Sequence, residues 1–514
     1  MTTQTAGTSL NAARRARDLV AVAERGQVDL LVVGGGVTGA GVALDAASRG
    51  LSVVLAERDD LASGTSRWSS KLVHGGLRYL ARGEIGIAYE SAAERGLIMG
   101  RIAPHLTRPL PMIYPWLPQT SRRSRAVTGT GFVAADLLRR AAGTSRQTLP
   151  GPRRVTRAEA VTAVPALRRD VAAGMLTWEG QLTDDARLVV AIARTAAGHG
   201  AVILTRCGAS GLTGDGGVLT DRLTGESFAL RARVVINATG VWAGQLTGGV
   251  TLRPSRGTHL VLADAAFGGL RAGVIAAVPG EHNRFVFALP VPGEPRVYVG
   301  LTDEPADGPV PDVPEPSAAE ITFLLDTVSA VLDAPVGPAD VLGAFAGLRP
   351  LLCGPPGNAS EATADLSRRH AVLTSPDGVI TVVGGKLTTY RRMAQDAVDA
   401  GRARARAGPC RTRGLPLAGA AGPAELARVR APARLVARYG TEAPDVLALA
   451  GQDPTLADPV ADGVPVTGAE LLFAVRHEGA LDAGDLLDRR TRIGLVPADR
   501  QQALPAAARA LASD

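Results

Sequence analysis

Short apolar runs alternate with a glycine turn and a helical pattern near the start of the chain. Residues 29–33 form an apolar run that stops at three consecutive glycines. Apolar residues then recur at helical spacing over 37–47, and a second apolar run, 52–56, ends at Glu57. Strand, glycine turn, helix and strand within about 30 residues predict a βαβ unit.

The remaining strand pattern is spread widely along the chain. Two further β-branched apolar runs, 234–238 and 379–383, also end at glycines and are predicted to complete the first sheet. Three strand-like runs separated by Pro and Gly turns predict a second, largely antiparallel sheet: 259–262, 284–289 and 296–301. Helices are predicted over 184–197, 318–332, 425–439 and 469–487. This element order indicates an α/β protein.

The glycine turn has the spacing of a dinucleotide-binding site. Gly34 permits the tight turn, Gly36 lets a pyrophosphate approach the backbone, and Gly39 lets the helix pack closely against the strand. The pyrophosphate is then expected at the positive end of the helix. Glu57, about 20 residues further on, ends the second strand, where a carboxylate accepts hydrogen bonds from a ribose hydroxyl.

The identity of the dinucleotide depends on the later strands. Glu57 disfavours NADP because its charge repels a 2′-phosphate. An NAD domain is more often contiguous, whereas here the sheet is completed by strands that come much later in the chain. Such interleaving is typical of a domain that binds FAD, because this long cofactor extends from the first domain into a second lobe. The architecture therefore favours FAD.

These patterns predict the domain boundaries. An FAD-binding domain (about 29–90, 180–255 and 340–400) is expected to be interleaved with a substrate lobe (about 91–179 and 256–339). The other predicted parts are a polar lead-in at 1–28, an arginine-rich linker at 401–414 and a helical domain at 415–514.

Composition and net charge limit the kinds of partner that the protein is expected to bind. The 514 residues are 46% hydrophobic and 20% charged, which is globular composition. The net charge of +7 favours an anionic partner, either a phosphorylated substrate, an anionic membrane or nucleic acid. Nucleic acid is disfavoured because aromatic residues make up only 4% and are not interleaved with basic ones.

Cysteine usage and hydropathy bear on the compartment. The three cysteines are far apart and form no CxxC pair, so neither a disulfide framework nor a zinc site is expected, and a reducing compartment fits. The N-terminal residues lack the apolar core of a signal peptide, and no window of about 20 apolar residues occurs. The expected location is cytoplasmic, or peripheral on the cytoplasmic face of the cell membrane.

One long segment resembles a known family. Residues 62–80, ASGTSRWSSKLVHGGLRYL, are similar to the second FAD motif of FAD-dependent glycerol-3-phosphate dehydrogenases. Further segments resemble the same family in unbroken order: 184–187, 237–240, 256–259, 347–350, 384–391, 475–478 and 489–494. The resemblance covers roughly residues 25–500. In one departure, Trp178 and Glu179 stand where the family usually has Tyr-Asp or Phe-Asp, and this segment is expected to touch the substrate lobe rather than the flavin.

The resemblance implies a fold and a reaction. The fold is a glutathione-reductase-like FAD domain of the Rossmann type, a substrate lobe with an antiparallel sheet and a C-terminal helical domain. The reaction is oxidation of sn-glycerol 3-phosphate to dihydroxyacetone phosphate by hydride transfer to flavin N5, with electrons passed to a membrane quinone. Alternatives are an oxidase that releases H2O2 from O2, a non-catalytic flavin-binding scaffold or redox sensor, and an amino-acid oxidase.

Alcohol oxidation requires a base, and His259 is the first candidate. Its ordinary pKa near ~6.5 suits proton transfer at neutral pH. It begins a predicted strand of the substrate lobe, directly after Arg-Gly-Thr. His74 and His370 are the rivals, and a purely structural histidine is the alternative.

A phosphate dianion requires planar, bidentate donors. Arg349 is preferred because no acidic residue lies within five positions of it, and Arg78 and Arg368 come next. Lys386 is expected near flavin N1 or the substrate oxygen, and Tyr79 beside the substrate. The expected catalytic set is His259, Arg349, Lys386 and Arg78, and the expected substrate set is Arg349, Arg78, Tyr79, Arg368 and Lys386.

Other residues of the matching segments are expected to contact FAD. Short hydroxyls suit the flavin phosphates, and glycine-rich backbone suits the ring edge. The expected cofactor contacts are Gly34, Gly36, Gly39, Glu57, Thr65, Ser66, Ser70, Lys71, His74, Gly75, Gly76, Gly240, Gly385, Lys386, Leu387 and Thr388.

A quinone reductase must reach the bilayer. Without a spanning helix its attachment is expected to be monotopic, through apolar or basic surface. Arginines of the lead-in (Arg14, Arg15 and Arg17) and of segments 119–155 and 401–413 are candidates, and a solvated face is the alternative. A homodimer is also possible.

Overall fold

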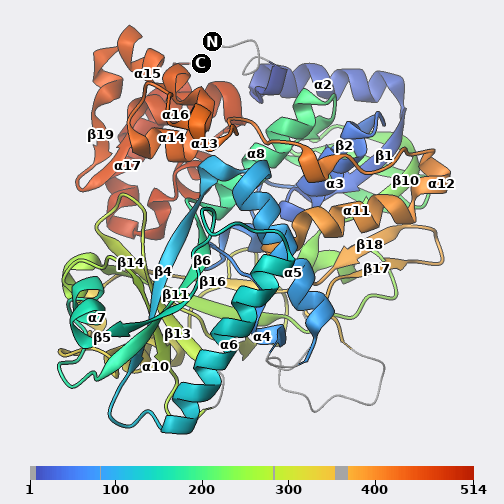
Figure 1. Ribbon diagram of the computed structural model, residues 1–514. Coiled ribbons are helices and arrows are strands. Elements are labelled where there is room, and N and C mark those ends of the chain that lie inside the picture. The colour runs from blue at the N-terminus through green and yellow to red at the C-terminus, as the bar shows by residue number, and fades with distance from the viewer. Residues whose placement is uncertain (1–6, 81–82, 282–283, 354–368, 514) are drawn as a thin grey trace.

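An eight-stranded and a ten-stranded β-sheet form the centre of the computed structural model, within the residues that it describes (7–80, 83–281, 284–353 and 369–513, without the side chains of Leu77 and Arg78). Figure 1 shows helices packed around both sheets and a mostly helical unit at the C-terminal end.

The first sheet joins strands from three distant parts of the chain. Its main path runs β17-β18-β10-β1-β2-β7, and all pairs except β17–β18 are parallel. The strands are β1 (Gln27–Val33), β2 (Val53–Ala56), β7 (Val202–Leu204), β10 (Ser227–Asn237), β17 (Ala371–Thr374) and β18 (Ile380–Val383). In addition, β9 (Gly216–Asp221) pairs with β10, and β8 (Cys207–Thr213) pairs with β9. The prediction that the runs at 234–238 and 379–383 join the two early strands in one sheet is confirmed.

Helices cover both faces of this sheet. On one face α3 (Val37–Ser48) lies between α8 (Asp185–Gly198) and α11 (Tyr390–Ala400). On the other, α2 (Ala12–Arg25) packs through Val22 against the buried side chains of Leu31 and Val33. Helix α8 begins as predicted, because the carboxylate of Asp184 accepts hydrogen bonds from the first backbone N–H groups.

The predicted polar lead-in is therefore wrong for residues 12–25. A helix needs only one apolar stripe to dock, and α2 supplies it despite its many arginines. Arg15, 8% exposed, is 2.6 Å from the Asp221 carboxylate, so this arginine is not available to a membrane.

The second sheet is the predicted, largely antiparallel one. Its main path runs β15-β11-β14-β13-β12-β4-β6-β3, and β4 with β12 is its one parallel pair among the described strands. The strands are β3 (Leu72–Val73), β4 (Thr107–Trp116), β5 (Arg153–Thr156), β6 (Ala173–Leu182), β11 (Ser255–Ala263), β12 (Gly273–Ala277), β13 (Phe285–Pro290), β14 (Arg296–Gly300), β15 (Glu304–Pro305) and β16 (Val341–Arg349). Helix α10 (Ala318–Ser329) covers it near β11 and β13.

Strand β16 corrects the predicted boundary at residue 340. It pairs antiparallel with β11 along almost its whole length and so belongs to the second sheet. Its apolar pattern suits either sheet, and only pairing decides between them. On the flank of the second sheet lie α4 (Leu77–Leu80), α5 (Ile85–Leu97), α6 (Arg122–Ala141) and α7 (Arg157–Ala163).

The C-terminal part is mostly helical, as predicted, with altered boundaries. The run expected over 425–439 is divided into α13 (Pro423–Leu426) and α14 (Ala433–Tyr439), because Pro432 interrupts it. The run expected over 469–487 ends at Gly479, whose φ of +71° terminates α16 (Gly468–Glu478). The other elements are α15 (Ala443–Gln452), α17 (Pro497–Ala512), β19 (Pro459–Ala461) and β20 (Val464–Thr467).

The segment predicted as a linker, 401–414, is part of the folded structure. It contains α12 (Arg402–Ala405), which contacts β10, and Ala405 and Ala407 are buried in the core of the first sheet. Across the described residues, no helix combines the length and the apolar character needed to cross a membrane.

Buried ion pairs join the C-terminal part to the segment that follows β2. The Asp60 carboxylate is 2.7 Å from Arg490 Nη1 and 2.6 Å from Arg489 Nε, and Asp60 and Arg490 are each at most 1% exposed. Burial alone raises the pKa of Asp60, but the two guanidinium groups outweigh it and hold the pKa below its ordinary 3.8. This pairing therefore stabilises the fold above pH 3.8 and loses its effect as the pH falls further.

We expect Asp60→Asn to lower the free energy of unfolding by about 3 kcal/mol, because Arg490 then stays buried without its counterion. The matched control is Asp333→Asn. Asp333 is 48% exposed and pairs with Arg169 at the surface, so the loss of this pair costs less than about 1 kcal/mol. Urea unfolding of both variants measures the difference; equal losses contradict the prediction.

Candidate active site

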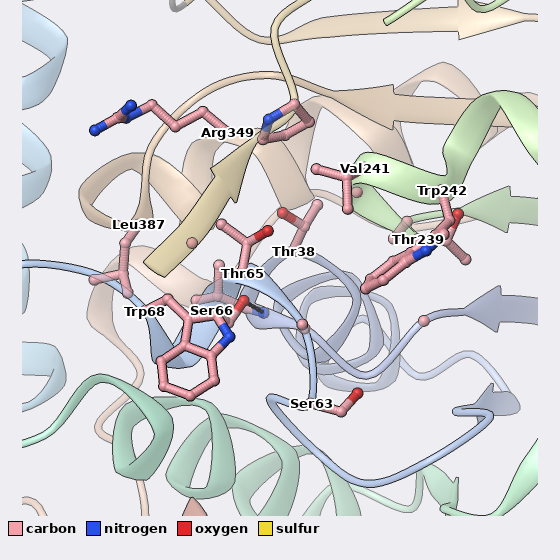
Figure 2. A pocket seen from close by; sticks show the side chains of 18 of the residues that line it. Thr38, Ser63, Thr65, Ser66, Trp68, Thr239, Val241, Trp242, Arg349 and Leu387 are labelled. Atoms are coloured by element: carbon pink, nitrogen blue, oxygen red, sulfur yellow. Dashed lines mark hydrogen bonds between the residues drawn. The ribbon is translucent and has the colours of Figure 1, made fainter. Parts of the chain in front are cut away.

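A cavity of about 560 Å³ lies where the two sheets meet. Its wall contains the ends of β1, β2, β10 and β18 of the first sheet and parts of β11 and β16 of the second. The carboxyl edge of a parallel sheet, at the point where strands from distant parts of the chain converge, is where ligands bind in this class of fold. Figure 2 shows the side chains at its centre.

The glycine turn forms one end of the cavity. An added Cβ at Gly34 would lie 2.7 Å from the Ala238 oxygen, and one at Gly39 only 1.8 Å from the Gly34 oxygen, so neither position has room for a side chain. Helix α3 begins here with Gly36 as N-cap, and the Val37 N–H donates to Ser66 Oγ (2.9 Å). Gly34 and Gly36 line the cavity, whereas Gly39 serves the packing of the helix.

Glu57 supports the turn as well as facing the cavity. One of its carboxylate oxygens accepts the Gly35 N–H (2.5 Å) and the other the Asp59 N–H (2.8 Å). Burial raises the pKa of Glu57, and these two hydrogen bonds oppose that rise. The contact with Gly35 was not anticipated from the sequence.

The matching segment 62–80 is divided between the cavity and the core. Thr65, Ser66, Ser70 and His74 line the cavity, and Thr65 Oγ1 donates to the Leu348 oxygen of β16 (2.7 Å). Figure 2 shows Thr65 and Ser66 near Thr38, beside the start of α3.

Lys71, Gly75 and Gly76, also expected to contact the cofactor, are not among the residues that line the cavity. Lys71 is 3% exposed, and its Nζ is 3.4 Å from Asp185 and 4.3 Å from the centroid of the Phe345 ring. Gly75 packs against the guanidinium of Arg95, where a Cβ would lie 2.2 Å from Nη1. The Lys71 side chain thus points into the core, and the sequence pattern contains no sign of that direction.

The departure from the family pattern lies beside Gly75. Glu179 is 3.0 Å from Arg95 Nη1 and accepts the Gly75 N–H (3.3 Å). Neither Trp178 nor Glu179 lines the cavity, and both belong to β6 of the second sheet.

The opposite wall is the turn after β18. Gly384 and Gly385 have φ of +75° and +74°, and with Lys386, Leu387 and Thr388 they line the cavity. Lys386 Nζ donates to Ser91 Oγ of α5 (2.9 Å) and lies 3.8 Å from the centroid of the Tyr79 ring. Gly240, with φ of +61°, also lines the cavity, whereas Tyr79 is buried beneath Lys386 and does not.

His259 lies in the wall on β11 and is 1% exposed. Its Nε2 is 2.8 Å from Ser70 Oγ, and its ring stacks on Phe345 at 4.8 Å and 10°. Nδ1 is buried and has no hydrogen-bond partner within the described part of the chain. Burial, with the nearby charges of Lys71 and Arg349, lowers the pKa of His259 well below 6.5, so the ring is neutral at neutral pH.

Arg349 is the last residue of β16 and is partly buried. Nη1 donates to Ser255 Oγ (3.1 Å) and lies 3.3 Å from the Asp303 carboxylate, while Nη2 donates to the Thr302 oxygen (2.9 Å). In Figure 2 its guanidinium extends to the side of Leu387, away from Trp242. The pairing of β11 with β16 places His259 opposite Phe345 and Ser255 opposite Arg349, so both candidate residues share one strand pair.

The other candidates lie elsewhere. His370 Nε2 is 2.9 Å from Asp396, and His370 does not line the cavity. The side chain of Arg78 and all of Arg368 lie outside the described residues. Asp303, Trp68, Trp242 and Phe345 were not among the candidates, although Trp68 lies inside the matching segment and Trp242 lies two residues after the segment 237–240.

The lining fits a flavin dinucleotide. The uncapped start of α3 suits a pyrophosphate, Glu57 a ribose, and the indoles of Trp68 and Trp242 flat apolar surfaces. The glycines at 384 and 385 let backbone approach the opposite end. One cavity therefore joins all the elements that an FAD site requires.

Comparisons with known proteins agree with this site. A family model described as FAD dependent oxidoreductase matches residues 29–391, and one described as C-terminal domain of alpha-glycerophosphate oxidase matches 410–514. Glycerol-3-phosphate dehydrogenase 1 of Mycobacterium tuberculosis is 56% identical over 506 residues, which cover 97% of this chain and 98% of that protein. Glycerol-3-phosphate dehydrogenase 2 of the same organism is 37% identical, covering 91% and 81%.

Solved structures give the same result. The glycerol-3-phosphate dehydrogenase from Bacillus halodurans, complexed with FAD, has a TM-score of 0.75 at 28% identity and covers 98% of this chain and 94% of its own. L-alpha-glycerophosphate oxidase from Mycoplasma pneumoniae, at 17% identity and a TM-score of 0.54, shares the fold.

Fold and site together define an FAD-dependent oxidoreductase. Within that class, the chain belongs to the FAD-dependent glycerol-3-phosphate dehydrogenase family, since the relationship extends over nearly the whole length at 56% identity. The predicted family and the predicted cofactor, FAD, are confirmed.

Proposed function

We propose that the chain oxidises sn-glycerol 3-phosphate to dihydroxyacetone phosphate, with His259 as base and Arg349 as the phosphate ligand, and passes the electrons to a membrane quinone. The observation that carries this proposal is the shared cavity. The glycine turn, the buried neutral His259 and Arg349 all line it.

FAD, when bound, supplies the two-electron acceptor. The chain's own residues manage the proton and the charge. We propose that His259 Nε2 accepts the proton of the substrate hydroxyl. This atom is 2.8 Å from Ser70 Oγ, and both residues line the cavity, whereas Nδ1 is buried. A histidine that is neutral before the reaction is able to accept the proton of the substrate hydroxyl.

Arg349 has the geometry for a phosphate ligand. Its contacts with Ser255, Asp303 and the Thr302 oxygen hold the guanidinium in one orientation before substrate binds. Such preorganisation reduces the entropy lost on binding, and the planar fork presents paired donors to phosphate oxygens. Lys386 adds a second cation, which stabilises the negative charge that develops as the hydroxyl loses its proton.

Anaerobic titration of the FAD-loaded protein with glycerol 3-phosphate tests the proposal. We expect the visible flavin absorbance to bleach with one equivalent of substrate, whereas glycine and proline leave it unchanged. Retention of the flavin colour at saturating glycerol 3-phosphate contradicts the dehydrogenase and favours a flavin-binding scaffold.

An oxidase is the second candidate, because residues 410–514 match the family described as the C-terminal domain of alpha-glycerophosphate oxidase. The two differ in the reoxidation step. We expect the reduced protein to be reoxidised rapidly by a quinone analogue and to release little H2O2 in air. Stoichiometric H2O2 release at a rate that matches turnover favours the oxidase instead.

A further inference from the structure

Helix α6 has an unusual distribution of polar and apolar side chains. Its outer stripe, defined here as Val127, Thr130, Val133, Leu137 and Ala141, recurs every three or four residues and is exposed. Val127, Val133 and Leu137 are 60%, 53% and 58% exposed. The stripe extends for roughly 20 Å along the helix, at 1.5 Å per residue. Large apolar side chains gathered on one outward helix face usually mark an interaction surface.

The inward side of the same helix carries charge. Asp136 is 8% exposed and lies 2.7 Å from Arg139 Nε, and Arg139 also donates to the Thr144 oxygen. Phe132 is the largest apolar residue on this side. A surface helix of a soluble domain normally buries its apolar residues and exposes its ion pairs. The second half of α6 instead buries the Asp136–Arg139 pair and exposes Val133 and Leu137, which is physically reasonable when the medium outside it is also apolar.

The surrounding charge identifies the chemistry of that medium. Segment 119–156 contains eight arginines and a single acid, the inward-facing Asp136. Arg122 and Arg123 are exposed at the start of the outer stripe, and Arg140 at its end. An apolar stripe flanked by cations matches the boundary between acyl chains and anionic lipid headgroups.

A second copy of the chain fits less well. In a twofold contact of α6 with α6, the arginines at one end would meet the arginine at the other, with only buried Asp136 to offset them. Like charges brought together oppose such a contact. The charge pattern therefore favours a lipid surface over self-association.

The position of the stripe relative to the active site also suits a membrane. Helix α5 packs against α6 (Figure 1). Its first turns expose Ile85 and Tyr89. The same helix carries Ser91, whose Oγ accepts a hydrogen bond from Lys386 Nζ at the cavity wall. A single helix, α5, thus connects the outer stripe with the part of the cavity where the flavin end is expected.

We propose that the outer stripe of α6, with Arg122, Arg123 and Arg140 around it, docks the protein onto an anionic lipid bilayer. The inference rests on the proposed transfer of electrons to a membrane quinone, and it adds the surface that brings the active site to the bilayer.

Vesicle binding by the FAD-loaded protein tests this surface. We expect co-sedimentation with vesicles of phosphatidylcholine and phosphatidylglycerol, and much weaker binding to pure phosphatidylcholine, since the arginines require anionic headgroups. Val133→Ser combined with Leu137→Ser should reduce the partition coefficient by about tenfold or more, because two apolar side chains no longer insert. The matched control, Leu223→Ser with Val313→Ser, changes equally exposed apolar residues elsewhere (58% and 53%) and should bind as the parent does.

Two activity readouts separate this proposal from the proposed function. Reduction of a water-soluble dye by glycerol 3-phosphate should be unchanged in both double variants, whereas reduction of a vesicle-embedded quinone should fall only in the α6 variant. Equal vesicle binding by the parent and the α6 variant overturns the proposal, as does failure of the parent to bind. A change of the α6 variant from dimer to monomer in sedimentation, without a change in vesicle binding, assigns the stripe to self-association. Loss of dye reduction in the parent overturns the dehydrogenase and not the docking surface.

Discussion

Arg349→Met is expected to lower kcat/KM for glycerol 3-phosphate by about a thousandfold, roughly 4 kcal/mol, through a rise in KM. The reason is the loss of two charge-assisted hydrogen bonds to the phosphate, each with a net value of about 1.5–3 kcal/mol. FAD content should stay normal, because the contacts of the guanidinium are with Ser255, Asp303 and the Thr302 oxygen, which do not line the cavity. Stopped-flow flavin reduction over a range of substrate concentrations measures the effect.

Two further variants make this prediction specific. Arg349→Lys should recover only part of the activity, since an ammonium has no planar fork. Arg256→Met removes a neighbouring arginine of β11 that pairs with Glu320 at 2.8 Å and does not line the cavity, so its KM should be unchanged. A normal KM in Arg349→Met, with the fold intact by thermal unfolding, removes Arg349 as the phosphate ligand.

His259→Ala should slow flavin reduction by about a thousandfold while substrate still binds, since positioned general bases contribute about 10²–10⁴-fold. The comparison set is His74→Ala and His370→Asn. His74 also lines the cavity, and His370 is occupied with Asp396 outside it. A large decrease in His74→Ala, together with a normal rate in His259→Ala, transfers the role to His74.

The pH dependence provides an independent test of the same residue. His259 acts as a base only when deprotonated, and burial with the Lys71 and Arg349 charges holds its pKa well below 6.5. The rate of flavin reduction should therefore stay level as the pH falls from neutral through 6.5, and decline only further down. Lys71→Met removes one of these cations and should move that decline to higher pH. A decline centred at 6.5 in the parent protein contradicts the buried, neutral histidine.

Much of the site was predictable because local sequence determines it. Gly34, Gly36 and Glu57 are a turn and a strand end within one βαβ unit, and their spacing alone places them together. His259 and Arg349 were identified as candidates by residue type and by the segments around them. Their partners were not, because Ser70, Phe345 and Asp303 come from other strands and loops and meet these residues only through tertiary packing.

Lys71 illustrates the limit of motif-based inference. It stands inside the most specific segment, directly after two serines that line the cavity, and yet its side chain turns inward to Asp185 at the start of α8. A motif defines which residues are close in sequence, whereas the direction of each side chain depends on what the rest of the chain packs against it.

The sequence by itself determined the βαβ unit, the interleaved order of the first sheet and the family, because these depend on periodicity and spacing along contiguous residues. Tertiary structure alone decided that β16 joins the second sheet, that residues 12–25 form a docked helix and that Arg349 meets Asp303. It also decided that the apolar side of α6 faces outward. These outcomes depend on pairing and burial between distant segments, and the pattern of one segment contains no record of its partners.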